Sequence, residues 1–208
     1  FVESAAREVG SVLRAGNLCV LESTSPPYST RMVEKIVSEV SGLAPEQFMT
    51  AHCPERIIPG RMLIELREND RIIGSNRPES AQFAKEIYEK VVTGGTIRLT
   101  DDLTAEMCKL TENTFRDINI AYANELSKVC DRLGIDVFKL IELANCHPRV
   151  NVHSPGVGVG GHCIAVDPWF IHEKFEDITP LIYEARLVND GKPAWTADRI
   201  ARDVKPGA

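Results

Sequence analysis

The stretch Leu18-Cys19-Val20-Leu21-Glu22-Ser23-Thr24-Ser25-Pro26-Pro27 decides the fold of the first half of the chain. It opens with a short, continuous apolar run, which is typical of a strand buried on both faces. Helical spacing precedes this run over residues 3–15 and follows it over residues 29–41. The order predicts an α/β domain whose polar loop lies at the carboxyl end of a parallel strand, where ligands bind. The hydroxyls of Ser23 and Thr24 are therefore candidate site groups, although helix capping and turn formation explain them equally well.

The same pattern continues along the chain. Three more strands are predicted over residues 48–52, 71–74 and 96–99, and a helix over residues 78–91. The strand at 48–52 leads into Cys53-Pro54-Glu55-Arg56, and Pro59 follows shortly afterwards. Because these prolines exclude regular structure, the charged pair Glu55 and Arg56 is expected on a constrained loop.

The character of the chain changes at Asp101-Asp102. From Leu103 to Leu133 there is neither proline nor glycine. One helix is therefore predicted, roughly 45 Å long at about 1.5 Å per residue, and Asp102 can cap its start. Shorter helices are predicted over residues 137–144, 169–175, 180–188 and 194–203, with a hinge at Asp190-Gly191-Lys192-Pro193. The predicted fold class is thus α/β followed by all-α.

A glycine-rich segment, Gly156-Val157-Gly158-Val159-Gly160-Gly161, runs into His162 and Cys163. Glycines lack a Cβ, so other groups can approach such a loop closely, which suits a reactive thiol better than a core one. A carboxylate, Asp167, follows four residues after the thiol. The glycines also satisfy G-x-G-x-x-G, but they neither follow a hydrophobic strand nor open a helix, as a dinucleotide fingerprint must. If the protein uses NAD, its pyrophosphate site is expected outside this chain.

Within the long predicted helix, Lys109 and Asn113 are four residues apart and therefore share a face. The simplest interpretation of Lys109 is a solvated charge. Glu106 and Glu112 are available as its ion-pair partners.

The overall composition excludes several classes of function. The net charge is −6 and the pI is about 5.5, which argues against nucleic acid or an anionic membrane as the main partner. No apolar run reaches the roughly 18 residues that a membrane span needs. Six cysteines are scattered singly, which predicts reduced thiols in a cytoplasmic protein, and their spacing matches no common metal site. The chain starts within a helical pattern, so we expect it to begin inside a larger protein.

Four motifs in this order resemble the UDP-glucose/GDP-mannose dehydrogenase family: Glu22-Ser-Thr-Ser-Pro26, Cys53-Pro-Glu-Arg56, Glu106-Met-Cys-Lys-Leu-Thr-Glu-Asn113 and Gly160-Gly-His-Cys-Ile-Ala-Val-Asp167. The resemblance covers essentially the whole chain and implies a three-part enzyme. Residues 1–101 would be the C-terminal portion of a Rossmann-like NAD-binding domain, 102–190 a central helical dimerisation domain with a catalytic cysteine loop, and 191–208 the start of a UDP-sugar-binding domain.

The resemblance also implies a reaction, oxidation of the C6 alcohol of a nucleotide sugar to a carboxylate with NAD. Cys163 would attack the intermediate aldehyde as a thiolate, giving a thiohemiacetal and then a thioester for hydrolysis. Lys109 would favour the thiolate and stabilise oxyanions, and Asn113 matches an oxyanion-binding amide. Asp167 matches a carboxylate that helps in proton transfer or orients water. The general base of the first step stays open between Asp167, Lys109 and a water.

Further site residues follow from the same resemblance. Glu55 matches a glutamate placed for base work or hydrolysis, and Thr24 a threonine beside the nicotinamide and an active-site water. The expected cofactor-binding residues are Ser23, Thr24, Glu55 and Cys163. The expected substrate-binding residues are Arg56, Arg149, Asn151, Gly160 and Gly161.

One departure from the family pattern concerns the substrate. Many members carry an aromatic residue where Arg56 stands, and a second glutamate where Pro59 stands. This change is consistent with a 2-acetamido sugar, and the resemblance implies UDP-N-acetylmannosamine, with UDP-N-acetylglucosamine and UDP-N-acetylgalactosamine as alternatives. A homodimer through the long helix is expected, and a different class stays open, in which this chain is a non-catalytic dimerisation module.

Overall fold

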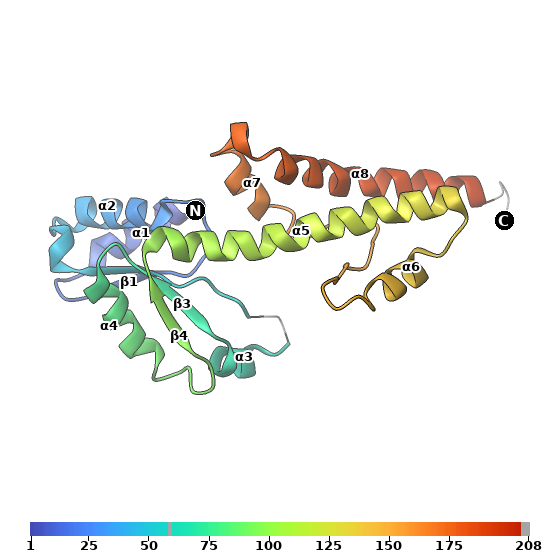
Figure 1. Cartoon of the computed structure of the whole chain (residues 1–208). Coiled ribbons are helices and arrows are strands. Elements are labelled where there is room, and N and C mark those ends of the chain that lie inside the picture. The colour runs from blue at the N-terminus through green and yellow to red at the C-terminus, as the bar shows by residue number, and fades with distance from the viewer. Residues whose placement is uncertain (58–59, 205–208) are drawn as a thin grey trace. The chain divides into compact units, whose positions relative to one another are not determined.

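The structure is a computed structural model that describes residues 1–57 and 60–204. Two compact units follow one another along the chain, Phe1–Lys109 and Leu110–Ala208 (Figure 1). The first holds a β-sheet with helices and the second is helical, so the predicted α/β and all-α fold class is confirmed. Within the described ranges, no helix is both long enough and apolar enough to cross a membrane.

The sheet of the first unit has four strands in the order β1-β2-β3-β4. Their bounds are Leu18–Leu21, Met49–His52, Arg71–Gly74 and Ile97–Thr100. The four predicted strands are confirmed within one residue at each end. β1 pairs with β2 in parallel and β3 with β4 in parallel, whereas β2 and β3 meet antiparallel at His52 and Gly74. The antiparallel step could not be predicted, because hydrophobic runs carry no information about strand direction.

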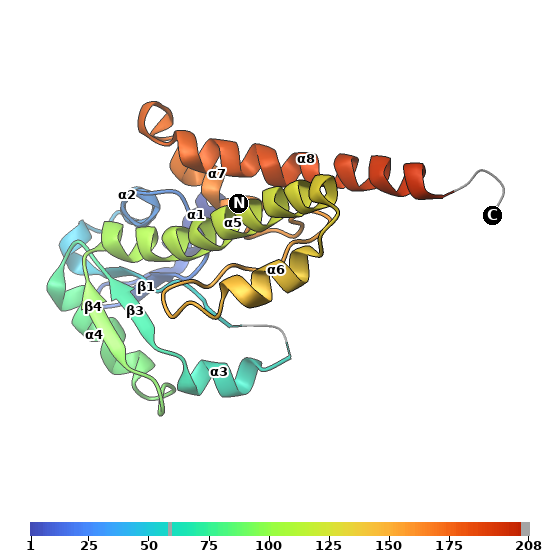
Figure 2. The same ribbon diagram turned by 45° about the vertical axis from the view of Figure 1, so that its right-hand side comes forward.

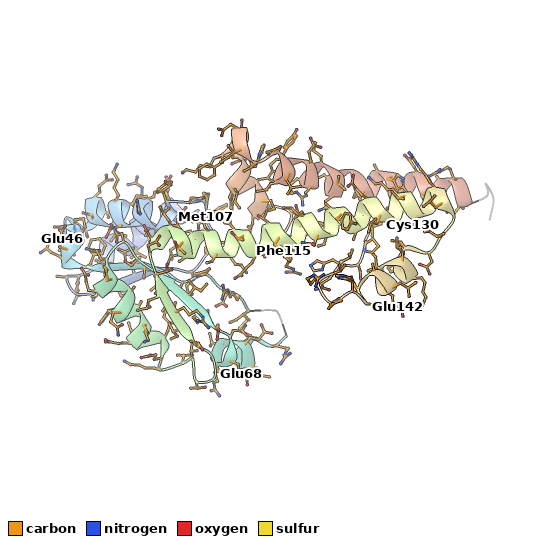
Figure 3. All side chains as sticks on the ribbon, viewed as in Figure 1. Glu46, Glu68, Met107, Phe115, Cys130 and Glu142 are labelled. Atoms are coloured by element: carbon orange, nitrogen blue, oxygen red, sulfur yellow. The ribbon has the colours of Figure 1, made fainter. Side chains whose placement is uncertain are left out.

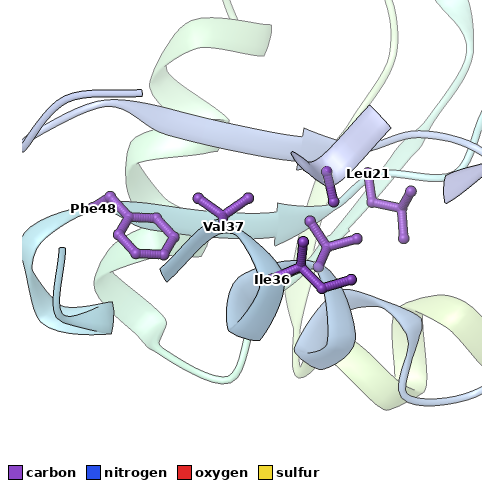
Figure 4. Close-up of a cluster of buried hydrophobic side chains, with 6 residues drawn as sticks. Leu21, Ile36, Val37 and Phe48 are labelled. Carbon is purple, nitrogen blue, oxygen red and sulfur yellow. The ribbon is translucent and has the colours of Figure 1, made fainter. Parts of the chain in front are cut away.

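Helices cover both faces of this sheet, because β1 is apolar on both sides. Cys19 and Leu21 pack in a cluster with α1 (Val2–Val12) and α2 (Ser29–Ser41), which Figure 4 shows around Leu21, Ile36, Val37 and Phe48. Leu18 and Val20 pack in a second cluster with α4 (Pro78–Tyr88). Side chains along a strand alternate between its two faces, so the four residues of β1 serve both clusters.

Two short elements of the first unit were not predicted from the sequence. They are the 3₁₀ helix η1 (Pro45–Gln47) and the helix α3 (Met62–Glu68). Three of the four apolar residues of α3, Met62, Leu63 and Ile64, are exposed, and Leu66 is half-buried. A short helix that buries no apolar stripe gives no periodic signal in the sequence.

Gly74 ends β3 where the first turn of α5 (Asp102–Leu133) packs on it. A Cβ on Gly74 would lie 2.3 Å from the carbonyl oxygen of Asp101 and 2.5 Å from Cβ of Ala105. We expect Gly74→Ala to lower the free energy of unfolding by about 1–3 kcal/mol, because the backbone must shift to admit the methyl group. Urea unfolding of the 208-residue chain measures the change.

Gly191 provides a matched control, since it lies inside a helix and a Cβ there meets no atom within 4 Å. Gly191→Ala should raise the free energy of unfolding by about 0.5–1 kcal/mol, through the lower backbone entropy of alanine in the unfolded chain. Equal effects of the two substitutions would show that the contact at Gly74 is unimportant.

His52, the last residue of β2, has a fully buried side chain. Burial lowers the pKa of His52 from 6.5 to about 4. Since the folded state binds the proton more weakly than the unfolded state, the stability it contributes is present above pH 6.5 and is lost as the pH falls toward 4. Between about pH 7 and pH 5 the free energy of unfolding should fall by about 2 kcal/mol. His52→Gln, which does not titrate, should lose this part of the pH dependence, and an unchanged slope would refute the assignment.

The second unit contains the rest of α5, and α6 (Val137–Ala144), α7 (Asp167–His172), the 3₁₀ helix η2 (Glu176–Ile178) and α8 (Pro180–Asp203). Figures 1 and 2 show α8 running beside α5. The predicted long helix is confirmed, and it begins one residue earlier than expected. The prediction of a hinge at residues 190–193 is wrong, because α8 continues through Pro193.

Packing of α8 against other elements explains why this helix continues through Gly191 and Pro193. The Lys192 ammonium group donates to the hydroxyl of Ser127 on α5 and lies 4.0 Å from the centre of the Trp195 ring. Pro193 itself packs against Gly158 of the glycine-rich segment, where a Cβ would lie 2.8 Å from Cγ of the proline. These tertiary contacts hold a helix that local propensity would interrupt.

Candidate active site

The carboxyl ends of β1 and β2 bring three predicted residues together. Beyond the strands, the N–H of Cys53 donates to the carbonyl of Leu21 at 3.0 Å, and the N–H of Glu55 donates to the carbonyl of Glu22 at 3.2 Å. Glu55 therefore lies beside the loop that carries Ser23 and Thr24. Ser23 is exposed and Thr24 is half-buried. The hydroxyl groups of Ser23 and Thr24, just beyond the carboxyl end of β1, are therefore accessible to a ligand.

The carboxylate of Glu55 is held by three donors. One oxygen accepts the N–H groups of Arg56 at 2.6 Å and Ile57 at 2.9 Å. The other oxygen pairs with the guanidinium of Arg71 at 3.0 Å. Arg71 is buried in β3, so it fixes the carboxylate from the interior of the unit. Pro59, the position of the missing second glutamate, lies outside the described residues.

The start of α5 is fastened to the start of α2 by two buried carboxylates. Asp102 pairs with Arg31 through two nitrogens, at 2.7 and 3.0 Å. Glu106 accepts the N–H of Tyr28 at 2.7 Å, and both the N–H and the hydroxyl of Thr30 at 2.7 and 2.6 Å. Burial raises the pKa of Glu106, against the lowering effect of these hydrogen bonds. The alternative that Glu106 pairs with Lys109 is therefore wrong, because its oxygens hold the loop that follows Ser23 and Thr24.

The predicted helix cap also needs correction. Asp101, not Asp102, caps α5, because its side-chain oxygens accept the N–H of Thr104 at 2.9 Å and its hydroxyl at 2.6 Å. Asp102 is fully buried inside the first turn. Lys109 is half-buried, two turns further along the same helix, where it ends the first unit.

In the second unit, the structure brings three predicted residues together. The amide of Asn113 donates to the carboxylate of Asp167 at 2.5 Å, and both side chains are buried. Asp167 begins α7, and its N–H donates to the carbonyl of Cys163 at 2.8 Å. Cys163 itself is exposed. An accessible thiol thus lies one helical turn from a carboxylate whose orientation a helix amide fixes.

The predicted substrate-binding residues of this unit are exposed. Arg149 and Asn151 lie on a loop that the side chain of Asn145 closes, through bonds to both the N–H and the carbonyl of Val152. Gly160 and Gly161 are also exposed, and Gly161 has φ of +88°. Residues 151–156 form no strand and residues 162–166 no helix, so the glycines lack the setting of a dinucleotide fingerprint, as predicted.

The predicted residues therefore fall into two groups, each inside one unit: Ser23, Thr24 and Glu55 at the sheet edge, and Cys163, Asn113 and Asp167 around the glycine-rich segment. Sequence reasoning missed Arg71, although an arginine opening an otherwise apolar strand is a detectable signal. It also missed a group of buried polar residues on α5 and α8, Asp117, Asn124, Arg186 and Asn189. Polar residues on a helix read as solvent-facing, so the sequence held no cue for them.

The polar groups at the carboxyl ends of β1 and β2 could bind a dinucleotide. Hydroxyl groups beside the carboxyl ends of two parallel strands are polar, partly exposed and held by a backbone bond between the loops. Ser23 and Thr24 can hydrogen-bond the polar substituents of a nicotinamide or ribose. The residues present therefore fit part of an NAD site.

An α/β domain with a site at the ends of its parallel strands, followed by a helical domain with an accessible thiol, is the arrangement of a dehydrogenase of the Rossmann type. Residues 1–92 match the NAD binding domain of the UDP-glucose/GDP-mannose dehydrogenase family, and residues 103–191 match its central domain. The chain belongs to this family. The expected cofactor, NAD, is confirmed by the match to the NAD binding domain.

Individual relatives are similar over nearly the whole chain. UDP-N-acetyl-D-mannosamine dehydrogenase of Yersinia pestis is 51% identical over 98% of this chain and 50% of its own length. NDP-N-acetyl-D-galactosaminuronic acid dehydrogenase of Ralstonia solanacearum is 53% identical over 99% of this chain and 50% of its own length. The solved UDP-D-ManNAc dehydrogenase of Pyrococcus horikoshii is 43% identical, with a TM-score of 0.92 over 97% of this chain and 48% of that chain. The chain thus spans about half the length of the curated relatives it matches.

Proposed function

We propose that this chain is the middle part of an enzyme that oxidises the C6 alcohol of a UDP-2-acetamido sugar to the carboxylate. The observation that carries the proposal is the exposed Cys163 one turn from Asp167, whose carboxylate Asn113 holds at 2.5 Å. In this scheme residues 1–101 complete an NAD-binding domain, residues 102–190 form the central domain and residues 191–208 begin a sugar-binding domain.

The substrate we propose is UDP-N-acetylmannosamine. Relatives named for this activity are 51% and 50% identical to the chain, in Yersinia pestis and Escherichia coli. UDP-N-acetylgalactosamine is the nearest alternative, since a relative named for the galactosaminuronic acid is 53% identical, and UDP-N-acetylglucosamine is a third. Arg56, Arg149 and Asn151 are exposed or half-exposed donors that can recognise the acetamido group or the phosphates.

Cys163 is the proposed nucleophile. Its thiolate adds to the carbonyl carbon of the C6 aldehyde, the C=O electron pair moves to the oxygen, and a thiohemiacetal forms. Loss of a hydride from that carbon leaves a thioester, which water cleaves to the carboxylate and the free thiol. NAD, when bound, supplies the hydride acceptor for each of the two oxidations.

The neighbours of Cys163 have separate roles in this proposal. Asp167 orients the hydrolytic water or takes up its proton, and its hydrogen bond from Asn113 keeps the carboxylate in one position. Lys109 and Asn113, one helical turn apart on α5, supply a positive charge and an amide donor for the oxyanions. Ser23 and Thr24 hold the cofactor, with Glu55 beside them.

Turnover tests this function. The enzyme that contains this chain is mixed with NAD and each of the three UDP-acetamido sugars, while NADH absorbance and the mass of the product are followed. We expect two NADH for each uronate formed, and the highest kcat/KM with UDP-N-acetylmannosamine. Aldehyde as the sole product, or no NADH with any of the three sugars, would contradict the proposal. The 208-residue chain alone should give no turnover, and NADH formation by it would contradict the division into parts.

A homodimer is proposed to form through α5. Phe115, Tyr122 and Val129 recur every seven residues along this helix and are 60%, 52% and 50% exposed. Figure 3 shows Phe115 on α5, and Cys130, which follows Val129, is buried. An exposed apolar stripe at this spacing is suited to the same stripe of a second copy. Sedimentation of the chain at micromolar concentration should show a dimer, and a monomer would count against this interface.

A further inference from the structure

The segment that carries Cys163 has little regular structure of its own. No helix or strand occurs between the end of α6 at Ala144 and the start of α7 at Asp167. The backbone of such a segment has a fixed position only where other elements form hydrogen bonds with it. One such point is Gly156, whose N–H donates to the side-chain oxygen of Asn124 on α5 at 2.9 Å.

Asn124 is the end of a chain of buried hydrogen bonds between α5 and α8. Its amide nitrogen donates to the side-chain oxygen of Asn189 at 2.8 Å. The amide nitrogen of Asn189 donates to the carboxylate of Asp117 at 2.8 Å and to its backbone carbonyl at 3.0 Å. Asp117 also accepts from Arg186 at 2.6 Å. All four side chains are at most 1% exposed.

The carboxylate of Asp117 determines which group donates and which accepts in each of these hydrogen bonds. An ionised carboxylate only accepts, so Asn189 must turn its NH₂ group toward Asp117 and its oxygen toward Asn124. Asn124 must then turn its own NH₂ group toward Asn189, which leaves its oxygen to face Gly156. The charge pair of Asp117 and Arg186 thereby decides which atom meets the segment.

The helix α5 holds this segment at two points, near its middle and at its C-terminal end. Asn113, Asp117 and Asn124 follow one another by four and seven residues, which places them on one face of the helix. Asn124 holds Gly156 and Asn113 holds Asp167. At about 1.5 Å per residue, the two holding residues are about 16 Å apart along the axis. Cys163 lies on the stretch between the two held points.

We propose that Asn124 and Asn189 are positioning residues for Cys163, acting through the bond from Asn124 to Gly156. The inference rests on the proposed function, in which Cys163 is the nucleophile. A misplacement of about 1 Å at a reacting group can cost about 100-fold in rate, so a loosened segment should lower kcat strongly.

Two substitutions at one position separate this role from simple packing. Asn124→Ala removes both bonds and leaves a cavity, whereas Asn124→Leu keeps about the size of the side chain, adds no charge and also removes both bonds. If Asn124 only filled space, Asn124→Leu would behave like wild type. The matched control is Asn119→Ala on the same helix, because the Asn119 amide donates to the carbonyl of Phe115 within its own helix.

The first measurement is hydrogen exchange of the 208-residue chain by mass spectrometry, which needs no activity. We expect about tenfold faster exchange at Gly156 and through residues 157–166 in both Asn124 variants, with α5 and α8 unchanged. The control should match wild type. Wild-type exchange in Asn124→Leu, or an acceleration spread evenly over α5 and α8, would overturn the proposal.

The second measurement is steady-state kinetics of the enzyme that contains this chain. We expect kcat to fall about 10- to 100-fold in both Asn124 variants, while KM for NAD stays within about twofold. An equal rise of KM for NAD would overturn the positioning role. Absence of NADH formation by the wild type would refute the proposed function instead, and the exchange measurement would still decide whether Asn124 holds the segment.

Discussion

Cys163→Ala is expected to abolish uronate formation in the enzyme that contains this chain, with kcat lower by about 1,000-fold or more. Without the thiol no thiohemiacetal forms, so the second oxidation and the hydrolysis have no covalent intermediate. Cys163→Ser should be nearly as inactive, because a hydroxyl at this position is a much weaker nucleophile than a thiolate. The measurement is kcat from NADH absorbance, with the carboxylate product followed by mass spectrometry.

Cys146 offers a matched control for this experiment. It is the other exposed cysteine, and its thiol donates to the carbonyl of Glu142 on α6 at 3.5 Å. Cys146→Ser should keep kcat within about twofold of wild type, because the thiol takes no part in the proposed reaction. Uronate formation at the wild-type rate by Cys163→Ala would remove Cys163 from the mechanism.

Arg186→Met is expected to give the largest loss of stability, about 3–5 kcal/mol in the free energy of unfolding. Arg186 and Asp117 form an ion pair at 2.6 Å, and both side chains are buried. Methionine fills similar space but leaves the carboxylate of Asp117 buried without its counter-charge. A fall in Tm of about 10 °C corresponds to this loss, and thermal and urea unfolding of the chain measure it.

A second variant tests whether the unpaired carboxylate of Asp117 causes the loss in the free energy of unfolding. In the double variant Asp117→Asn with Arg186→Met, no buried charge remains, because Asp190, the other partner of Arg186, is half-exposed, and the new amide oxygen can still accept from Asn189. We expect this variant to recover more than half of the lost free energy. A loss as large as that of Arg186→Met alone would assign the effect to packing instead.

The pH gives a second check on the same pair. Burial raises the pKa of Asp117, and Arg186 opposes that effect. Removing Arg186 should raise the pKa further. A carboxyl whose pKa is raised in the folded state contributes stability at low pH and loses it as the pH rises. The deficit of Arg186→Met relative to wild type should therefore shrink between neutral pH and pH 5, and a constant deficit would contradict the charge argument.

Much of the fold was open to prediction because its signals are local. The apolar run at Leu18–Leu21 is four residues long and packs against helices on both faces, so it reads as a strand without knowledge of its neighbours. The absence of glycine and proline from Leu103 to Leu133 predicts one helix in the same way. The helix α3 was missed because it has no fully buried residue and most of its apolar residues are exposed, so the sequence holds no pattern of burial.

The candidate site also has a part that local sequence indicates and a part that depends on distant contacts. The proposed reactive groups, among them Cys163, Asp167 and Asn113, stand in short motifs, because the proposed chemistry needs particular side chains at fixed local spacing. Their supports come from distant parts of the chain. Glu106 holds Thr30, which is 76 residues away, and Asn124 bonds Asn189, which is 65 residues away. No local pattern can indicate such a pairing.

The sequence by itself thus determined the class of fold and the family, and it supplied the candidate site residues. Only the tertiary structure decided that α8 continues through Pro193, that Asp101 caps α5 and that Arg71 fixes Glu55. The physical reason is the same in each case. Propensity and periodicity act within a few residues, whereas the partner of a buried polar group, and the packing that holds a proline within a helix, are set by which distant segments meet when the chain folds.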